Sequence, residues 1–182
     1  MLALQTGDAA AFERLVEHYQ GPAFAMLRRI LGPSAPIEDL AQEAFLRVWR
    51  NRDRYRPEGK FSTFLYRVTY NLALNRLRDA GRKPVHGLPT DSTGAVIEPA
   101  DPADPAQGGR LDRGVWADRI GQALQNLPEN QRAALVFQHY DGLDLAEIGE
   151  ILDLSPQAVK SLLHRGRERL REILEPYWNS EK

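Results

Sequence analysis

The sequence predicts an all-α protein with two helical domains joined by a flexible linker. Apolar residues recur at three- and four-residue spacing through most of the 182 residues, and no long stretch alternates apolar with polar residues as a strand would. Between Pro84 and Asp112 this spacing is lost, and five prolines, several glycines and scattered acidic residues take its place. We therefore expect domains at residues 1–83 and 113–178, separated by an acidic linker at residues 84–112.

Four helices are expected in the first domain. Asp8 is an N-cap residue ahead of apolar positions at helical spacing, and Pro22 suits the first turn of a second helix that ends at Gly32-Pro33. Ser62 is expected to cap the fourth helix. With these limits the expected helices cover residues 8–19, 22–31, 36–50 and 62–77, and a polar loop occupies residues 51–60.

The second domain ends in the pattern of a helix-turn-helix. Two further helices are expected before it, at residues 115–127 and 128–140. Asp144 and Glu147 have the spacing of a capping box at the start of a short helix, and a tight turn is expected at Asp153-Leu154. Ser155 then caps the last helix, in which Pro156 takes the first position, where its missing N–H group costs nothing.

The last helix has the surface expected of a recognition helix in a DNA major groove. Val159, Leu163 and Leu170 supply its buried side. The opposite side carries donors for base edges near its N-terminus and cations for phosphates behind them. These residues are Gln157, Lys160, Ser161, His164, Arg165, Arg167, Arg169 and Arg171. A helical pair with a merely solvated basic face has the same pattern, so that alternative stays open.

The third helix carries an acidic, hydrogen-bonding surface. Asp39, Gln42, Glu43 and Arg47 lie near one another at three- and four-residue spacing, beside an apolar core face. For this helix taken alone, ordinary solvation is the favoured explanation of the surface.

The fourth helix and the loop before it combine aromatic, amide and cationic side chains. Unpaired bases require such a set, with aromatic faces for stacking, amides for base edges and positive charge for phosphates. The residues are Arg52, Arg54, Tyr55, Arg56, Lys60, Phe61, Tyr66, Arg67, Tyr70, Asn71, Asn75, Arg76 and Arg78. Some of the aromatic residues must belong to the core. By helical phase Phe64 and Leu65 are buried, whereas Tyr55 could lie in the core or at the surface.

Charge and composition exclude several classes of protein. The net charge is −1, but residues 28–83 contain 13 Lys or Arg against 6 Asp or Glu, so basic and acidic surfaces are segregated. Cysteine is absent, which excludes a disulfide framework and a thiolate zinc site. The four histidines lie in different segments and no glycine-rich phosphate loop occurs, so we expect no enzyme, no metal site and no cofactor. No apolar run approaches the roughly 20 residues of a membrane span, so a cytosolic protein without membrane insertion is expected.

Three sequence segments together resemble a known family. They are DLAQEAFLRVW, KFSTFLYRVTYNLALNRLR and, after the proline-rich segment, LPENQRAALVFQHYDGLDLAEIGEILDLSPQAVKSLLHRGRERL. In this order and spacing they resemble a bacterial RNA polymerase sigma factor of the extracytoplasmic-function (ECF) group of the sigma-70 family. The resemblance covers nearly the whole chain except the linker. It implies a region 2-like four-helix domain and a region 4-like helix-turn-helix domain.

The resemblance also implies partners and roles for individual residues. Core RNA polymerase would be bound through its β′ clamp coiled coil and β flap, with Asp39, Gln42, Glu43 and Arg47 on the clamp. The melted −10 element of promoter DNA would be captured by Tyr55, Arg56, Lys60, Asn71, Asn75 and Arg76. The −35 element would be read as duplex by Gln157, Lys160, Ser161, His164, Arg165 and Arg167.

Two further expectations and one rival complete this interpretation. The resemblance implies an anti-sigma factor as partner, and a cytoplasmic protein that joins the nucleoid when active and can be held at the membrane through that partner. The acidic linker either threads a positively charged polymerase channel or is simply disordered. The rival function is a helix-turn-helix transcriptional regulator that binds duplex DNA only, which would have no need of the aromatic, amide and arginine side chains on the fourth helix.

Overall fold

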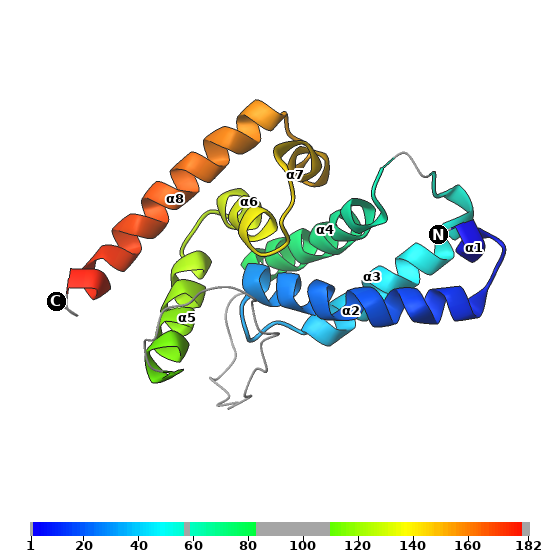
Figure 1. Cartoon of the computed structure of the whole chain (residues 1–182), viewed down its shortest axis with the longest axis horizontal. Coiled ribbons are helices and arrows are strands. Elements are labelled where there is room, and N and C mark those ends of the chain that lie inside the picture. The colour runs from blue at the N-terminus through cyan, green and yellow to red at the C-terminus, as the bar shows by residue number, and fades with distance from the viewer. Residues whose placement is uncertain (1, 57–58, 83–109, 180–182) are drawn as a thin grey trace.

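The computed structural model describes residues 2–56, 59–82 and 110–179, so most of the expected linker lies outside it (Figure 1). Every regular secondary-structure element in these ranges is a helix, which confirms the all-α prediction. They are α1 (Leu2–Gln5), α2 (Ala9–Leu31), α3 (Ile37–Arg50), the 3₁₀ helix η1 (Arg52–Arg54), α4 (Phe61–Arg82), α5 (Arg110–Gln125), α6 (Glu129–His139), α7 (Leu145–Leu152) and α8 (Pro156–Asn179). Within the same ranges, none of the helices is both long enough and apolar enough to cross a membrane.

α2 is one continuous helix of 23 residues, so the prediction of two helices meeting at Pro22 is wrong. Its start is as predicted, because the Asp8 side chain accepts a hydrogen bond from the Ala11 N–H group at 3.0 Å. A proline inside a helix removes one N–H donor and crowds the preceding turn. Here Tyr19 before Pro22 and Met26 after it both pack into apolar clusters, and this packing outweighs the local preference of proline.

Two other helix boundaries differ from the prediction. α4 begins at Phe61, so Ser62 lies inside the helix rather than at its cap, and the Lys60 carbonyl accepts the Phe64 N–H group at 3.3 Å. α5 begins at Arg110, inside the segment that we assigned to the linker. Once a helix is nucleated, each added residue gains one hydrogen bond, so α5 extends beyond the apolar residues that made it recognisable.

The first domain is a bundle of α1 to α4 around an apolar core. Leu4 of α1, Ala23 of α2, Phe45 and Val48 of α3 and Leu65 of α4 are buried together. This packing fixes which side of α3 faces solvent, and so positions the polar side chains of that helix.

The helix-turn-helix is confirmed in detail. The Asp144 carboxylate accepts the Glu147 N–H group at 2.9 Å, and the Glu147 carboxylate accepts the Asp144 N–H group at 3.0 Å, which completes the capping box. Asp153 takes a left-handed conformation at the turn, with φ of 57°. Ser155 then caps α8 by accepting the Ala158 N–H group at 3.2 Å.

The two domains pack against each other through one continuous apolar core. Met26 of α2 and Tyr70 of α4 share this core with Phe137 of α6, Ile148 of α7 and Val159 of α8. In Figure 1, α7 lies between α4 and α8 and packs against both, while α6 packs against α2 and α8. The sequence did not lead us to expect this contact between the domains.

Asp141, in the loop after α6, lies at this contact. The Tyr66 hydroxyl of α4 donates a hydrogen bond to its carboxylate, whose Oδ2 atom is buried without a partner among the described residues. Burial raises the pKa of Asp141 to about 7, and the positive charge of Arg29 and the Tyr66 hydrogen bond lower it only in part.

Asp141→Asn is therefore expected to stabilise the protein more at pH 8 than at pH 5. The pKa of Asp141 in the folded protein lies above its ordinary value of 3.8, so the folded state binds the extra proton. The folded state is therefore most stable, relative to the unfolded state, below about pH 4, where Asp141 is neutral in both, and it loses stability as the pH rises to about 7. Asparagine cannot ionise, so the variant does not lose this stability at high pH. Chemical denaturation at both pH values measures it, with Asp53→Asn in η1 as the exposed control, and an equal effect at both pH values would contradict it.

Candidate polymerase and nucleic-acid interfaces

The polar side of α3 is exposed, as predicted, but its charges are partly paired. Asp39 and Gln42 are exposed, while Ala41 and Ala44 on the opposite side are buried. The Arg47 Nε atom donates to Glu43 Oε1 at 2.8 Å, and an Arg50 nitrogen lies 3.8 Å from Glu43 Oε2. These contacts lower the pKa of Glu43, the Arg47 hydrogen bond most. α3 therefore presents a surface of acid, amide and arginine rather than a purely acidic one.

The cationic and amide residues of α4 are exposed. Arg67, Asn71 and Asn75 recur at four-residue spacing along one side of the helix, and Arg76 is exposed about 100° round the helix from Asn75. Lys60 and Arg56, just before α4, are exposed as well. We call these six residues the α4 stripe. The structure thus leaves five of the six residues expected at the −10 element exposed, together with Arg67.

Tyr55 is the exception, because it belongs to the core. It is 9% exposed, and its ring packs edge-on against Phe64, with ring centroids 5.0 Å apart. Gln5 of α1 donates to the Tyr55 carbonyl at 2.7 Å, which fixes the loop at this point. Tyr66 and Tyr70 are buried too, so in this arrangement neither they nor Tyr55 offers a face for stacking bases.

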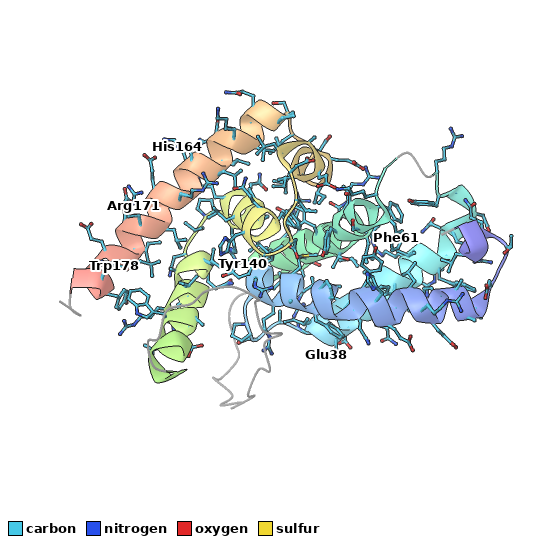
Figure 2. The ribbon with its side chains drawn as sticks, viewed as in Figure 1. Glu38, Phe61, Tyr140, His164, Arg171 and Trp178 are labelled. Carbon is cyan, nitrogen blue, oxygen red and sulfur yellow. The ribbon has the colours of Figure 1, made fainter. Side chains whose placement is uncertain are left out.

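The expected reading face of α8 points away from the rest of the molecule. Val159 and Leu163 are buried against the domain, while Gln157, Lys160, Ser161, His164, Arg165 and Arg167 are exposed. In Figure 2, His164 and Arg171 project from the outer side of α8. His164 Nε2 lies 3.4 Å from a Glu168 oxygen, and Arg165 Nε donates to the Ser161 carbonyl at 3.3 Å. All six residues expected at the −35 element are therefore exposed on α8.

Arg167 differs from the others because α6 holds it. Its guanidinium donates to the Gln138 side chain, which links α8 to α6. A guanidinium engaged in this way is less free to reach a base edge, and is better placed to position the helix or to meet a phosphate. The sequence could not reveal this, because Gln138 is 29 residues away.

Comparison with known proteins matches both domains. Residues 15–83 match the family model Sigma-70 region 2, and residues 117–170 match Sigma-70, region 4. The chain is 35% identical over 180 residues to the ECF RNA polymerase sigma factor SigW of Bacillus subtilis (strain 168), across 94% of this chain and 92% of that protein. It is 32% identical to the ECF RNA polymerase sigma-E factor of Escherichia coli (strain K12), across 95% and 91%. This chain belongs to the ECF sigma factors.

Two solved structures share the fold of this sigma factor. One is CnrH in complex with the cytosolic domain of CnrY, with a TM-score of 0.68 and 23% identity over 96% of this chain and 94% of that one. The other is the sigma factor RpoE from Bartonella quintana in complex with the anti-sigma factor NepR, with a TM-score of 0.69 and 24% identity over 91% and 97%.

Gly149 is a structural position of the helix-turn-helix that the sequence interpretation missed. It is buried in α7, and its N–H and C=O groups lie where the chain turns into α8, with the Leu154 N–H group donating to the Gly149 carbonyl at 2.9 Å. A Cβ atom at Gly149 would lie 2.6 Å from the Leu154 carbonyl oxygen. Glycine thus allows the close approach that sets the angle between α7 and α8. The sequence could have indicated this role, because Gly149 lies four residues before the predicted turn at Asp153-Leu154.

Proposed function

We propose that this sigma factor binds core RNA polymerase and directs initiation at selected promoters, reading the −35 element as duplex with α8 and capturing melted −10 DNA with the α4 stripe. The observation that carries this proposal is the presence of two separate surfaces suited to nucleic acid. One is the exposed face of a helix-turn-helix. The other is an exposed row of arginine and asparagine on α4, in the other domain.

The polar side of α3 is our candidate for the contact with core polymerase. It carries exposed acid and amide groups, and would suit the β′ clamp coiled coil, with the second domain on the β flap. An anti-sigma factor is a further proposed partner, since the solved structures with this fold include sigma factors bound to such proteins. We propose a cytoplasmic and nucleoid location, with retention at the membrane through the anti-sigma factor, and no catalytic step of its own.

Transcription by purified core polymerase tests this proposal directly. A pool of promoter fragments from the source genome should give new transcripts only when the sigma factor is added. The rival, a regulator of duplex DNA only, would bind fragments without core polymerase and would start no transcript from core enzyme alone. That second outcome would overturn the proposal.

Glu43→Lys is expected to weaken binding to core polymerase on the order of tenfold, because it places a like charge against a basic partner surface. The melting temperature should stay nearly unchanged, since Arg47 and Arg50 are exposed and the Glu43 side chain is 37% exposed, so these ion pairs are well solvated. Glu17→Lys, an exposed charge reversal on α2, is the matched control. Fluorescence anisotropy with labelled sigma factor measures the affinity, and equal affinity of both variants would remove this surface from the proposal.

Arg165→Ala is expected to lower −35 affinity selectively, by about 1–3 kcal/mol on the preferred sequence. Arg165 lies in the N-terminal half of α8, within reach of base edges, whereas Arg169 lies farther along the exposed side. Arg169→Ala should weaken all sequences alike and reduce the salt dependence. Binding to a panel of −35 variants at two salt concentrations measures this. A uniform loss for Arg165→Ala would assign base reading to Lys160, Ser161 or His164.

A further inference from the structure

The first helix, α1, is tied to the segment that leads into α4. The Gln5 side-chain amide donates to the Tyr55 carbonyl at 2.7 Å, although the two residues are 50 positions apart. Leu4, next to Gln5, is fully buried with Val48 of α3 and Leu65 of α4. In Figure 1, α1 lies at the end of the first domain where the chain passes from α3 towards α4. This short helix therefore holds a main-chain group of a distant segment.

The turn after α1 keeps Gln5 in place. Gly7 has a φ of 81°, in the left-handed region that glycine adopts readily, and its N–H group donates to the Leu4 carbonyl at 3.0 Å. Asp8 then caps α2. The chain thus folds back from α1 directly into α2, and this turn, with the burial of Leu4, gives α1 a fixed position on the domain.

The hydrogen bond from Gln5 orients the peptide that leads to Arg56. The Tyr55 carbonyl and the Arg56 N–H group belong to one planar peptide unit, so a fixed carbonyl also fixes the direction in which the chain reaches Arg56. The Tyr55 N–H group donates to the Arg52 carbonyl at 3.3 Å. Both main-chain polar groups of Tyr55 are therefore engaged, and the exposed Arg56 follows a residue that is held at both of them.

Aromatic rings hold Tyr55 from the side of α4. Its ring packs edge-on against Phe61 and Phe64, with ring centroids 6.2 and 5.0 Å apart. Arg56 directly follows Tyr55, and Lys60 directly precedes Phe61. Two of the cations expected at the −10 element are thus each next to an anchored aromatic residue.

Arg52 braces the other end of η1. The sequence grouped it with the candidate phosphate-binding cations, but its guanidinium donates to the Trp49 carbonyl at 2.8 Å and lies 4.4 Å from the centre of the Trp49 ring. That ring packs in turn against Phe12 of α2, with centroids 5.0 Å apart. α2 and α3 therefore hold the start of η1, while α1, through Gln5, holds Tyr55 at its end.

We infer that Gln5 is a positioning residue for the capture of melted −10 DNA, because its hydrogen bond to Tyr55 sets the direction in which Arg56 is presented. The inference rests on the proposed function of Arg56 in the α4 stripe. Gln5 acts through the Tyr55 main chain and does not itself touch the strand. A group already held in its binding position loses less conformational freedom on binding, so this anchor raises the affinity for the strand.

Gln5→Met removes the anchor while it nearly keeps the length and the net charge of the side chain. Methionine has no N–H group, so the Tyr55 carbonyl loses this donor. Gln20→Met on α2 makes the same change at an exposed site and is the matched control. From the typical net contribution of one hydrogen bond, we expect the affinity of Gln5→Met for the strand to fall about threefold to tenfold. The control should bind as the parent does.

Strand binding is measured on the full chain in complex with core polymerase. The probe is a labelled DNA single strand that carries the −10 region of a promoter transcribed by this complex, and core polymerase alone is the blank. Arg56→Ala, alone and combined with Gln5→Met, completes a double-mutant cycle. Because Gln5 acts through Arg56, Gln5→Met should have little effect in the Arg56→Ala background. Affinity for −35 duplex should stay unchanged, since α8 belongs to the other domain.

Hydrogen exchange tests the anchor without DNA. The amide N–H groups of residues 52–56 should exchange severalfold faster in Gln5→Met, because the Tyr55 N–H group is released more often once the neighbouring carbonyl is free. Exchange in Gln20→Met should equal that of the parent.

The outcomes separate the positioning role from the proposed function. Faster exchange, together with a loss of strand affinity that depends on Arg56 and spares −35 duplex, supports the inference. An equal loss with and without Arg56, or an equal loss on −35 duplex, would make Gln5 a residue of the fold only. Unchanged exchange in Gln5→Met overturns the positioning role and leaves the proposed function standing. If Arg56→Ala itself leaves strand binding unchanged, the −10 assignment of Arg56 fails, and the positioning role fails with it.

Discussion

Gly149→Ala is expected to destabilise the second domain by about 1–3 kcal/mol, the usual cost of forcing an extra methyl group into a packed site. The added Cβ atom would lie 2.6 Å from the Leu154 carbonyl oxygen. Because that oxygen belongs to the backbone, it cannot rotate away as a side chain would. α7 and α8 must shift relative to each other, so affinity for −35 duplex should fall by more than the loss of stability alone explains.

Gly121→Ala is the matched control for this substitution. Gly121 lies inside α5, and a Cβ atom there would meet nothing within 4 Å. Alanine should stabilise that helix by up to about 1 kcal/mol, because it restricts the unfolded chain. Thermal unfolding and duplex binding of both variants measure the difference. If Gly149→Ala binds duplex DNA as the parent does, the close approach at Leu154 does not set the recognition helix.

The sequence predicted the helix-turn-helix well because the interactions that define it are local. The capping box joins residues three apart, and Ser155 caps α8 through the N–H group three residues later. The α2 prediction failed where a local rule was opposed by tertiary packing, since Pro22 lies between residues that are held in two apolar clusters. The prediction that Ser62 caps α4 was wrong because the helix begins one residue earlier, at Phe61.

The candidate site was predicted less completely, because exposure depends on distant residues. The polar face of α8 follows from helical spacing alone, and all six expected residues are exposed there. Tyr55 is buried by Phe64 and by α1, and Tyr66 and Tyr70 by α6, contacts that no spacing reveals. The packing of the two domains against each other lay beyond the sequence for the same reason.

Arg132 shows how a charged residue can contribute to that packing. It is only 7% exposed, and its guanidinium donates to the Leu127 carbonyl at 3.1 Å, to the Gln125 side chain at 2.6 Å and to the Ile30 carbonyl. Ile30 lies in the last turn of α2, where carbonyl groups lack partners within the helix and the helix dipole favours a cation. Arg132 of the second domain therefore satisfies the end of a helix in the first.

Arg132→Met is expected to cost about 3 kcal/mol of unfolding free energy, because it keeps the apolar stem but leaves buried carbonyls without a donor, at about 1–3 kcal/mol each. Arg132→Lys keeps the charge but cannot reach three acceptors from one fixed plane, so an intermediate loss is expected. Chemical denaturation compares both with Arg171→Met, an exposed site on α8 that should change little. Burying a guanidinium also costs free energy, since burial lowers its pKa. A methionine variant as stable as the parent would mean that this cost equals the gain from the three hydrogen bonds.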